Sequence, residues 1–255
     1  FVVGTGGLHA SVNNRVYEAD DHHMILDIDV TSLYPSIAIG QGYYPEHLGK
    51  QFVSTYRTLR TQRIGYKKGS AENAMLKLAL NGVYGASGDK FSIFYDPLFT
   101  MKITIGGQMM VLKLVEWILS LGYVKIIQAN TDGVTLYLPR VQLTNVQSLC
   151  AEWEKLTDLT LEHVQYSKMA IRDVNNYLAV SLDGKVKRKG AYEHDMEWHQ
   201  NASALVIAKV AEQVLVHGKP IRETVMNWPD KMDFMLRVKV PRSSHLLWGE
   251  TQVQN

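Results

Sequence analysis

The chain has 255 residues, of which 46% are apolar and 20% are charged. This length allows one large domain or two or three smaller lobes, with enough apolar material for a sizeable core. The 27 basic and 25 acidic residues leave a net charge of +2, so a polyanion must be bound by a local cluster of basic side chains. The single cysteine, Cys150, excludes a disulfide framework and a four-cysteine metal site. No uninterrupted apolar run approaches the roughly 18 residues of a membrane span, and no signal peptide is recognisable, so membrane and secreted classes are not expected.

The first third of the chain predicts a buried strand followed by a helical hairpin. A short apolar run over 23–30 indicates a strand that ends near Asp29. Apolar and basic residues recur at helical spacing over 51–67, which predicts one helix. A glycine then breaks the pattern, and Ser70 is placed to cap a second helix over 71–84.

The rest of the chain alternates between helical and strand-like segments without a repeating strand–helix–strand period. This order favours an α+β fold over a doubly wound sheet. Two of the strands are separated only by a short polar joint ending in glycine, which predicts a β-hairpin. The predicted segments are a helix over 101–121, strands over 124–128 and 134–137, a helix over 143–156, strands over 168–172 and 176–182, a basic strand over 185–189 and a helix over 202–217.

Two aspartates stand at the ends of predicted strands. Asp29 closes the first strand, and Asp132 lies at the tip of the later hairpin. Two carboxylates brought together repel each other unless a divalent cation lies between them. A pair of Mg²⁺ ions about 3.5–4 Å apart is the usual device for in-line phosphoryl transfer. The two residues therefore predict a two-metal site; the alternative is that both are ordinary strand-end residues that solvate a loop.

Three ordered motifs resemble those of the family B DNA polymerases. The segment DVTSLYPS from Asp29 is similar to motif A, DxxSLYPS, and KLALNGVYG from Lys77 is similar to motif B, Kx3NSxYG. The segment NTDG from Asn130 resembles motif C, which is usually DTDS. GTGG from Gly4 resembles the YxGG segment, and KVKRKGAY from Lys185 resembles the later KxY-type primer-binding segment. The residues of these motifs resemble those of bacteriophage-type members most.

The resemblance implies an α+β polymerase core in which a palm with an antiparallel sheet carries two-helix fingers and a short partial thumb. The implied domains are palm over 1–48 and 89–195, fingers over 49–88, and thumb or its start over 196–255. The implied activity is template-directed addition of dNTPs to a primer 3′-hydroxyl by two-metal-ion nucleotidyl transfer. Its partners would be primer-template DNA and dNTPs, and its cofactor two Mg²⁺ ions, with Mn²⁺ as a substitute. The implied location is the cytoplasm, that of the host cell if the chain is phage-encoded.

Catalytic roles follow from the same resemblance. Asp29, the backbone carbonyl of Val30 and Asp132 would bind the metal ions. Lys77 would contact the triphosphate and protonate the leaving pyrophosphate. Tyr34 would be the steric gate that leaves no space for a ribose 2′-hydroxyl; the alternative for this tyrosine is plain core packing next to a turn.

The remaining dNTP contacts come from one turn and two helices. Backbone N–H groups in the turn after Asp29 can face triphosphate oxygens. Lys77 and two later residues are spaced i, i+4 and i+7, so they share one helix face. The first helix of the hairpin would add phosphate contacts, although an ordinary solvated basic face is the usual meaning of such charges. The dNTP-binding residues are Ser32, Leu33, Tyr34, Arg60, Arg63, Lys67, Lys77, Asn81 and Tyr84.

DNA contacts are expected from the glycine-rich loop and from the basic strand. Which lysine of that strand corresponds to the family's KxY lysine is left open by its spacing to the following tyrosine. Asp27, which shares a strand face with Asp29, either assists the metals or is a solvated strand residue. The DNA-binding residues are Gly6, Gly7, Lys185, Lys187, Arg188, Lys189 and Tyr192.

Departures from the family pattern keep other functions open. Asn130 replaces the first aspartate of motif C, Gly133 replaces its serine, and Gly82 replaces the serine of motif B. These substitutions favour, as an alternative function, a catalytically silent polymerase-like DNA-binding subunit of a split polymerase. A cyclase-type nucleotidyl transferase with a similar palm is a second alternative. No DxE-type pair precedes Asp29, so a proofreading site is not expected, and a separate exonuclease or thumb-bearing chain is a possible partner; the short interval from Asp29 to Lys77 makes protein priming unexpected.

Overall fold

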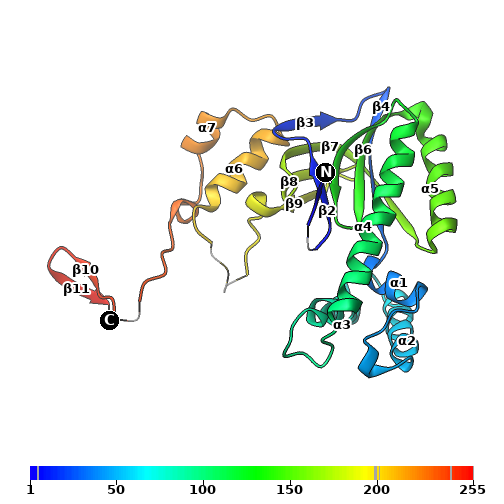
Figure 1. Cartoon of the computed structure of the whole chain (residues 1–255). Coiled ribbons are helices and arrows are strands. Elements are labelled where there is room, and N and C mark those ends of the chain that lie inside the picture. Colours follow the sequence, from blue (N-terminus) through cyan, green and yellow to red (C-terminus); the bar gives the residue numbers. More distant parts are fainter. Residues whose placement is uncertain (5, 198–199, 201, 242, 255) are drawn as a thin grey trace. The chain divides into compact units, whose positions relative to one another are not determined.

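The computed structural model describes residues 1–4, 6–197, 200, 202–241 and 243–254. They form two compact units, Phe1–Lys187 and Arg188–Asn255. The first unit has the predicted α+β architecture, built on a curled antiparallel sheet in the order β1-β2-β5-β6-β4-β7-β8-β9, with β3 also paired to β7 (Figure 1). Its strands are β1 (Val2–Val3), β2 (Leu8–Ser11), β3 (Arg15–Glu18), β4 (His23–Val30), β5 (Lys125–Asn130), β6 (Gly133–Pro139), β7 (Leu161–Asp173), β8 (Asn176–Ser181) and β9 (Val186–Lys189), the last of which continues into the second unit.

Five α-helices belong to the described part of this unit. Two of them, α4 and α5, cover one face of the sheet, and α2 and α3 form the predicted hairpin (Figure 1). Short 3-10 turns at Glu46–Leu48 and Arg140–Gln142 lead into α2 and α5. The helices are α1 (Leu33–Gly40), α2 (Gln51–Gly65), α3 (Ala71–Ser87), α4 (Pro97–Ser120) and α5 (Leu143–Thr157).

Strand β4 is the central element, because it pairs with both β6 and β7. Successive side chains of a strand point to opposite faces. Leu26 and Ile28 therefore enter the core beneath the helices. Ile25 enters a second, smaller cluster on the opposite face. Asp27 and Asp29 continue the row of Ile25, so both acids lie on the sheet face that α4 and α5 leave uncovered.

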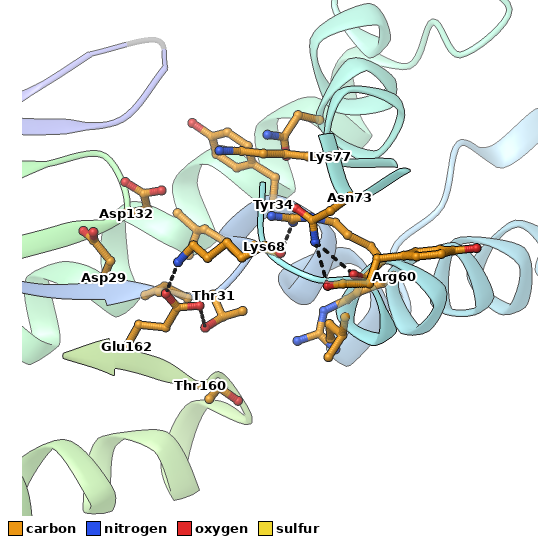
Figure 2. Close-up of a pocket in the computed structure, with 17 residues that line it drawn as sticks. Asp29, Thr31, Tyr34, Arg60, Lys68, Asn73, Lys77, Asp132, Thr160 and Glu162 are labelled. Atoms are coloured by element: carbon orange, nitrogen blue, oxygen red, sulfur yellow. Dashed lines mark hydrogen bonds and ion pairs between the residues drawn. The ribbon is translucent and has the colours of Figure 1, made fainter. Parts of the chain in front are cut away.

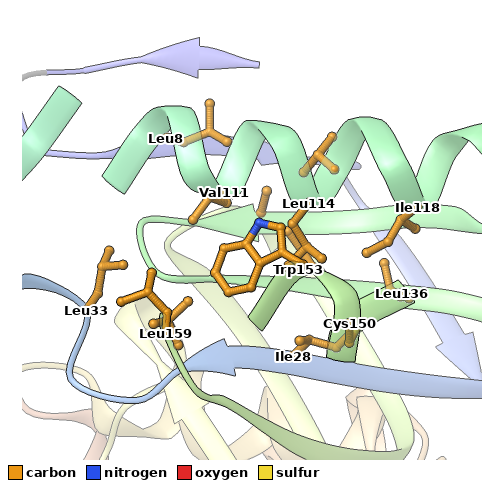
Figure 3. Close-up of a cluster of buried hydrophobic side chains, with 14 of the residues drawn as sticks. Leu8, Ile28, Leu33, Val111, Leu114, Ile118, Leu136, Cys150, Trp153 and Leu159 are labelled. Atoms are coloured by element: carbon orange, nitrogen blue, oxygen red, sulfur yellow. The ribbon is translucent and has the colours of Figure 1, made fainter. Parts of the chain in front are cut away.

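Trp153 of α5 is at the centre of the main core and is fully buried (Figure 3). It packs among Val111 and Leu114 of α4, and its indole Nε1 donates a hydrogen bond of 2.8 Å to the carbonyl of Met110. Cys150 lies in the same cluster, and burial raises the pKa of its thiol to about 12. The thiol therefore stays protonated, which suits a packing role.

The α2–α3 hairpin is closed by the predicted cap. Ser70 Oγ accepts a hydrogen bond of 3.2 Å from the Asn73 backbone N–H, and Asn73 Nδ2 donates to the carbonyl of Arg63. Between the helices, the buried hydroxyl of Tyr56 donates to the carbonyl of Leu80. Helix ends leave backbone groups without partners, and these side chains satisfy several of them. The turn between α2 and α3 is fixed as a result.

Helix α4 is, among the described residues, the one helix long and apolar enough to cross a membrane by length and composition. Lys102, Lys113 and Glu116 interrupt the apolar runs of this helix in the sequence. In the structure 44% of its most apolar window is buried within the protein, and Ile103 and Ile118 are fully buried in the core. Packing against the sheet accounts for this composition.

The second unit contains short elements joined by ion pairs. Glu212 of α6 accepts hydrogen bonds from the guanidinium of Arg188 and lies 3.0 Å from His194 Nε2. Lys209 of the same helix donates to both oxygens of Asp233. The elements of this unit are a 3-10 turn at Gly190–Tyr192, α6 (Leu205–Leu215), α7 (Ile221–Met226), a second 3-10 turn at Lys231–Phe234, and a hairpin of β10 (Leu246–Trp248) and β11 (Thr251–Gln254).

Candidate functional site

A cavity of about 470 Å³ opens where β4 ends and α1 begins (Figure 2). The ends of β4, β6 and β7 form one side of it, and the α2–α3 hairpin forms the other. Acidic residues lie on the strand side and basic residues on the helix side. The lining residues are Asp29, Val30, Thr31, Ser32, Leu33, Tyr34, Arg60, Arg63, Ile64, Tyr66, Lys68, Asn73, Lys77, Asn81, Asp132, Thr160 and Glu162.

The structure brings Asp29, at the end of β4, close to Asp132, in the turn between β5 and β6. Asp29 of β4 is in register with Gly133 of β6, the residue after Asp132. The backbone N–H of Val30 donates a hydrogen bond of 2.7 Å to the carbonyl of Asp132, which fixes the turn between β5 and β6 beside the end of β4. Figure 2 shows the two carboxylates next to each other at the strand side of the cavity.

These carboxylates are crowded by like charges and partly removed from water. Burial, followed by the charges of Asp27 and Asp132, raises the pKa of Asp29 to about 7. Burial also raises the pKa of Asp132, although Lys187 and Lys77 oppose this effect. The two neighbouring carboxylates repel each other, and a divalent cation bound between them would relieve that repulsion.

The donor set fits a hard cation such as Mg²⁺. Carboxylate and backbone oxygens are the ligands that this ion prefers, and Asp29, Asp132 and Val30 contribute such atoms to the wall of the cavity. No cluster of three or more His, Cys, Asp or Glu side chains suited to a metal occurs among the described residues. A magnesium ion here would therefore complete its shell with water and substrate oxygens, as Mg²⁺ commonly does.

Gly133 makes room for the carboxylate of Asp29. A Cβ atom built at this glycine would lie 1.9 Å from Asp29 Oδ1 and 2.8 Å from the carbonyl oxygen of Ile28. No side chain can be added without moving both the carboxylate and the β4 backbone. The departure from serine at this position thus allows β4 and β6 to approach closely at the site.

Asn130, the other departure in motif C, forms a hydrogen bond with the next residue of the chain. Its side-chain oxygen accepts a hydrogen bond of 3.3 Å from Thr131 Oγ1, and His9 Nε2 lies 3.4 Å from the same hydroxyl. Asn130 is also in register with His9 of β2. The residue that replaces the family's first aspartate is therefore part of a polar row with His9 and is not among the cavity-lining residues.

The basic side of the cavity comes from the helical hairpin. Arg63 donates from Nη1 to Ser32 Oγ, while burial and the charge of Arg63 lower the pKa of Arg60. The Nε atoms of these two arginines are the only buried side-chain polar atoms among the described residues without a hydrogen-bond partner. Buried donors without partners are costly, so they favour an anionic ligand in the cavity. Lys77 and Asn81 of α3 line the same wall.

Tyr34 lines the cavity and is backed by Tyr84, which is not among the lining residues. The rings of Tyr34 and Tyr84 are stacked, with centroids 3.8 Å apart and planes at 17°. The hydroxyl of Tyr34 donates a hydrogen bond of 2.7 Å to the carbonyl of Gly6, and that of Tyr84 shares one with Thr104. Both rings are held rigidly, as a surface that measures the shape of a ligand requires.

Some predicted dNTP contacts are placed differently. Lys67 is exposed and does not line the cavity, whereas its neighbour Lys68 does. The ammonium of Lys68 is 2.8 Å from Glu162 Oε2, and Thr31 Oγ1 donates to the other oxygen of Glu162. Leu33 lines the cavity but buries its side chain in the core.

Lys68 and Glu162 were missed by sequence reasoning. Glu162 is in register with Asp29, but the predicted strand began at residue 168, so this end of β7 carried no expectation. The register shared with Asp29 would have identified it had the strand been predicted at full length. Lys68 directly follows the predicted helix over 51–67 and was not among the predicted dNTP contacts.

The predicted DNA-binding residues fall into two groups. Gly6 and Gly7 adjoin the site. The carbonyl of Gly6 accepts the hydrogen bond from Tyr34, and a Cβ atom added to Gly7 would lie 2.8 Å from Thr131 Oγ1. Lys185 is exposed and pairs with Asp183.

The other residues of the basic segment differ in their surroundings. Lys187, the last residue of the first unit, reaches the buried carboxylate of Asp27. Arg188, in the second unit, is committed to Glu212. Lys189 is exposed and Tyr192 is half-buried.

The alternative that Asp27 is a solvated strand residue was wrong. Its side chain is 93% buried and accepts hydrogen bonds from the hydroxyls of Thr135 and Tyr166. β4 lies between β6 and β7 in the sheet, and each of these strands contributes one of the two hydroxyls. The alternation of side chains along β4 placed Asp27 correctly on the same face as Asp29. Its burial could not be predicted, because it depends on Tyr166, in the half of β7 that the sequence did not predict.

Comparison with solved structures identifies the fold. The chain is similar to the family B DNA polymerase from the hyperthermophilic archaeon Pyrobaculum calidifontis, with a TM-score of 0.56 and 19% identity over 87% of this chain and 32% of that chain. What the two share is a fold. The chain spans about a third of the length of that polymerase. No protein-family model matches the chain, and no curated protein matches it in sequence.

Proposed function

We propose that the chain is the core of a template-directed DNA polymerase that adds dNTPs to a primer 3′-hydroxyl. The observation that carries this proposal is the polarity of the cavity, in which Asp29 and Asp132 face Arg60, Arg63 and Lys77. A nucleoside triphosphate bound to divalent ions needs carboxylates near its metals and cations near its phosphates. The polymerase-like fold and the three ordered motifs support the same reaction class.

The side chains would act mainly by positioning and by neutralising charge. Asp29, Asp132 and the carbonyl of Val30 would hold two Mg²⁺ ions, which supply activation of the primer hydroxyl and stabilisation of the triphosphate when bound. Arg60, with its free Nε donor, would bind phosphate oxygens at the opposite wall. Lys77 would donate a proton to the departing pyrophosphate.

The stacked tyrosines would select the sugar and base. Tyr34, fixed by Tyr84 and by the carbonyl of Gly6, would stand where a ribose 2′-hydroxyl has no space. Asn81 and Tyr84 would line the new base pair. A rigid stacked pair suits this role because an exclusion surface must not yield to the ligand.

The rest of the chain would hold primer-template DNA. We assign palm to 1–48 and 89–195, fingers to 49–88 and thumb or its start to 196–255. Gly6, Gly7, Lys185, Lys187 and the following basic segment would contact the duplex backbone near the primer terminus. A separate chain carrying an exonuclease or further thumb is proposed as a partner, and the bacteriophage origin and cellular location stay predictions.

Primer extension tests this proposal directly. Purified chain is given a labelled primer-template, dNTPs and Mg²⁺, and the assay is repeated with Mn²⁺. We expect extension by the wild type and a loss of about 10³-fold or more in Asp132→Ala, because the metal centre loses a ligand. Asp21→Ala, which removes an exposed aspartate outside the cavity, serves as the matched control and should retain full activity.

One observation favours a second function, that of a catalytically silent DNA-binding subunit. Asn130 contributes no charge and faces Thr131 and His9, so the site has one acid fewer than the family pattern. DNA binding without extension in either metal would establish this alternative. A cyclase-type transferase is less well supported, because Lys77 and Asn81 line the cavity as motif B of a polymerase requires.

A further inference from the structure

Asp27 is a buried acid directly behind the proposed metal ligands, and the mechanism above does not use it. Thr135 Oγ1 donates a hydrogen bond of 2.7 Å to one carboxylate oxygen, and the hydroxyl of Tyr166 donates one of 3.2 Å to the other. Lys187 Nζ lies 3.7 Å from the second oxygen. Three groups from β6, β7 and the start of β9 therefore fix the orientation of this carboxylate.

Two tyrosine rings and the carboxylate of Asp27 surround the ammonium of Lys187. Its ammonium lies over the rings of Tyr166 and Tyr177, 5.8 and 5.7 Å from their centroids, and donates to the hydroxyl of Tyr166 at 3.3 Å. Ammonium groups over aromatic faces are stabilised by the ring quadrupole. Burial lowers the pKa of Lys187, but Tyr177, Asp27 and Tyr166 raise it by more, so the pKa is above its ordinary value. The side chain is therefore a permanent cation.

This cation is close enough to influence the proposed metal ligands without pairing with them. Its charge lowers the pKa of both Asp29 and Asp132, yet the described residues include no ion-pair partner for either aspartate. Of Asp27, Asp29 and Asp132, only Asp27 is at ion-pair distance from Lys187. The ammonium is thus turned away from the two carboxylates that form the wall of the cavity.

We propose that Asp27 is a positioning residue that holds the Lys187 ammonium away from Asp29 and Asp132, so that both carboxylates stay available to divalent cations. This inference rests on the proposed function, because it assigns the metal-binding role to those two aspartates. Without Asp27, the carboxylates that the charge of this ammonium still reaches are those of Asp29 and Asp132. An ion pair with Lys187 would then compete with the metal for the same oxygens.

The test is a double-mutant cycle on Mn²⁺ binding, measured by electron paramagnetic resonance in the absence of DNA and nucleotide. The variants are Asp27→Asn, Lys187→Met and the double variant, with Asp132→Ala to identify binding at the site. We expect Asp27→Asn to raise the Mn²⁺ Kd about tenfold, the size usual for groups that orient metal ligands. Lys187→Met alone should change it by less than about twofold, and the double variant should return to within about threefold of the wild type.

Non-additivity separates positioning from a general charge effect. If the two substitutions only change the electrostatic potential, Lys187→Met alone will tighten Mn²⁺ binding by as much as Asp27→Asn weakens it, and that result overturns the inference. An unchanged Kd in Asp27→Asn overturns it as well. If Asp132→Ala has no effect on Mn²⁺ binding, the metal centre of the proposed function fails, and the inference fails with it.

Asp27→Asn could also disturb folding, because the carboxylate accepts hydrogen bonds from two buried hydroxyls. Near-ultraviolet circular dichroism and thermal unfolding of each variant check this. Tyr166→Phe is the second route, since it removes the hydroxyl that contacts both Asp27 and Lys187. It should weaken Mn²⁺ binding at least about twofold and be rescued by Lys187→Met; no weakening overturns the inference.

Discussion

Burial of Asp29, followed by the charges of Asp27, Asp132 and Glu162, raises its pKa to about 7. Between its ordinary value of 3.8 and about 7, the native chain binds more protons at this residue than the unfolded chain does. Metal-free stability must therefore fall as the pH rises through this window and stay low above it. A divalent cation would remove the penalty, which links folding to metal binding.

Asp29→Asn should consequently stabilise the metal-free protein at pH 8 but not at about pH 3, where the wild-type carboxyl is largely protonated in both states. We expect a gain of about 1 kcal/mol, or roughly 2–4 °C in Tm. Thermal unfolding in EDTA at both pH values measures it. Asp21→Asn, at an exposed position, is the control. Equal stabilities at pH 8 would show that Asp29 is not strained in the native state.

Gly133 offers a second residue-scale prediction. Gly133→Ala places a methyl group 1.9 Å from Asp29 Oδ1 and 2.8 Å from the Ile28 carbonyl, so the strands must separate. Overpacking of this kind costs about 1–3 kcal/mol. Urea unfolding should show this loss, together with weaker Mn²⁺ binding.

The matched control is Gly82→Ala on α3, where nothing lies within 4 Å of the added Cβ. That change should be neutral or stabilising, because alanine favours helix over glycine by up to about 1 kcal/mol. A Gly133→Ala variant as stable as Gly82→Ala would contradict the close approach of β4 and β6.

At the scale of single elements, α3 depends on its cap. Ser70→Ala removes the acceptor for the Asn73 N–H and should destabilise the protein by about 1 kcal/mol. Faster amide hydrogen exchange at the start of α3 should accompany the loss. Ser70→Asp keeps an acceptor and adds a favourable charge at the helix N-terminus, so it should match the wild type. Equal exchange in all three proteins would mean that the packing of Tyr56 alone holds the hairpin.

The elements that the sequence predicted well are those whose pattern is local. Strand β4, the β5–β6 hairpin, α5 and the capped α2–α3 hairpin have apolar periodicity and clear end signals. Helix α1 was not predicted, because it begins after Ser32 at a positive φ of 54° and carries Pro35. Its conformation is imposed by packing on α2 and α4.

Strand β7 shows why part of the site was missed. Its first half is polar and largely exposed, so it lacks the alternation that marks a strand. Only pairing with β4 makes it extended, and that pairing places Glu162 beside Asp29 and Tyr166 over Asp27. Residues of the site that lie in motifs could be predicted, whereas those supplied by long-range pairing could not.

At the scale of the whole molecule, a net charge of only +2 means that DNA binding must depend on local clusters. Each phosphate neutralised should steepen the dependence of log K on log salt by about 0.9. Lys185→Gln and Lys189→Gln should each lower that slope by about this amount in fluorescence anisotropy titrations with primer-template DNA. Lys113→Gln, which removes a lysine of α4 outside the basic segment, should leave the slope unchanged. Slopes identical in all variants would remove the basic segment from the DNA-binding surface.

The position of β4 at the centre of the sheet has a consequence for synthesis of the protein. Its apolar residues leave the ribosome before its two partners, β6 and β7, which are translated more than a hundred residues later. During that interval the nascent chain carries an extended apolar segment with both edges open, the kind of segment that associates with other chains. We therefore expect translation in a chaperone-depleted extract to give mostly aggregated product, and refolding of the full-length chain from denaturant to be far more efficient at low protein concentration.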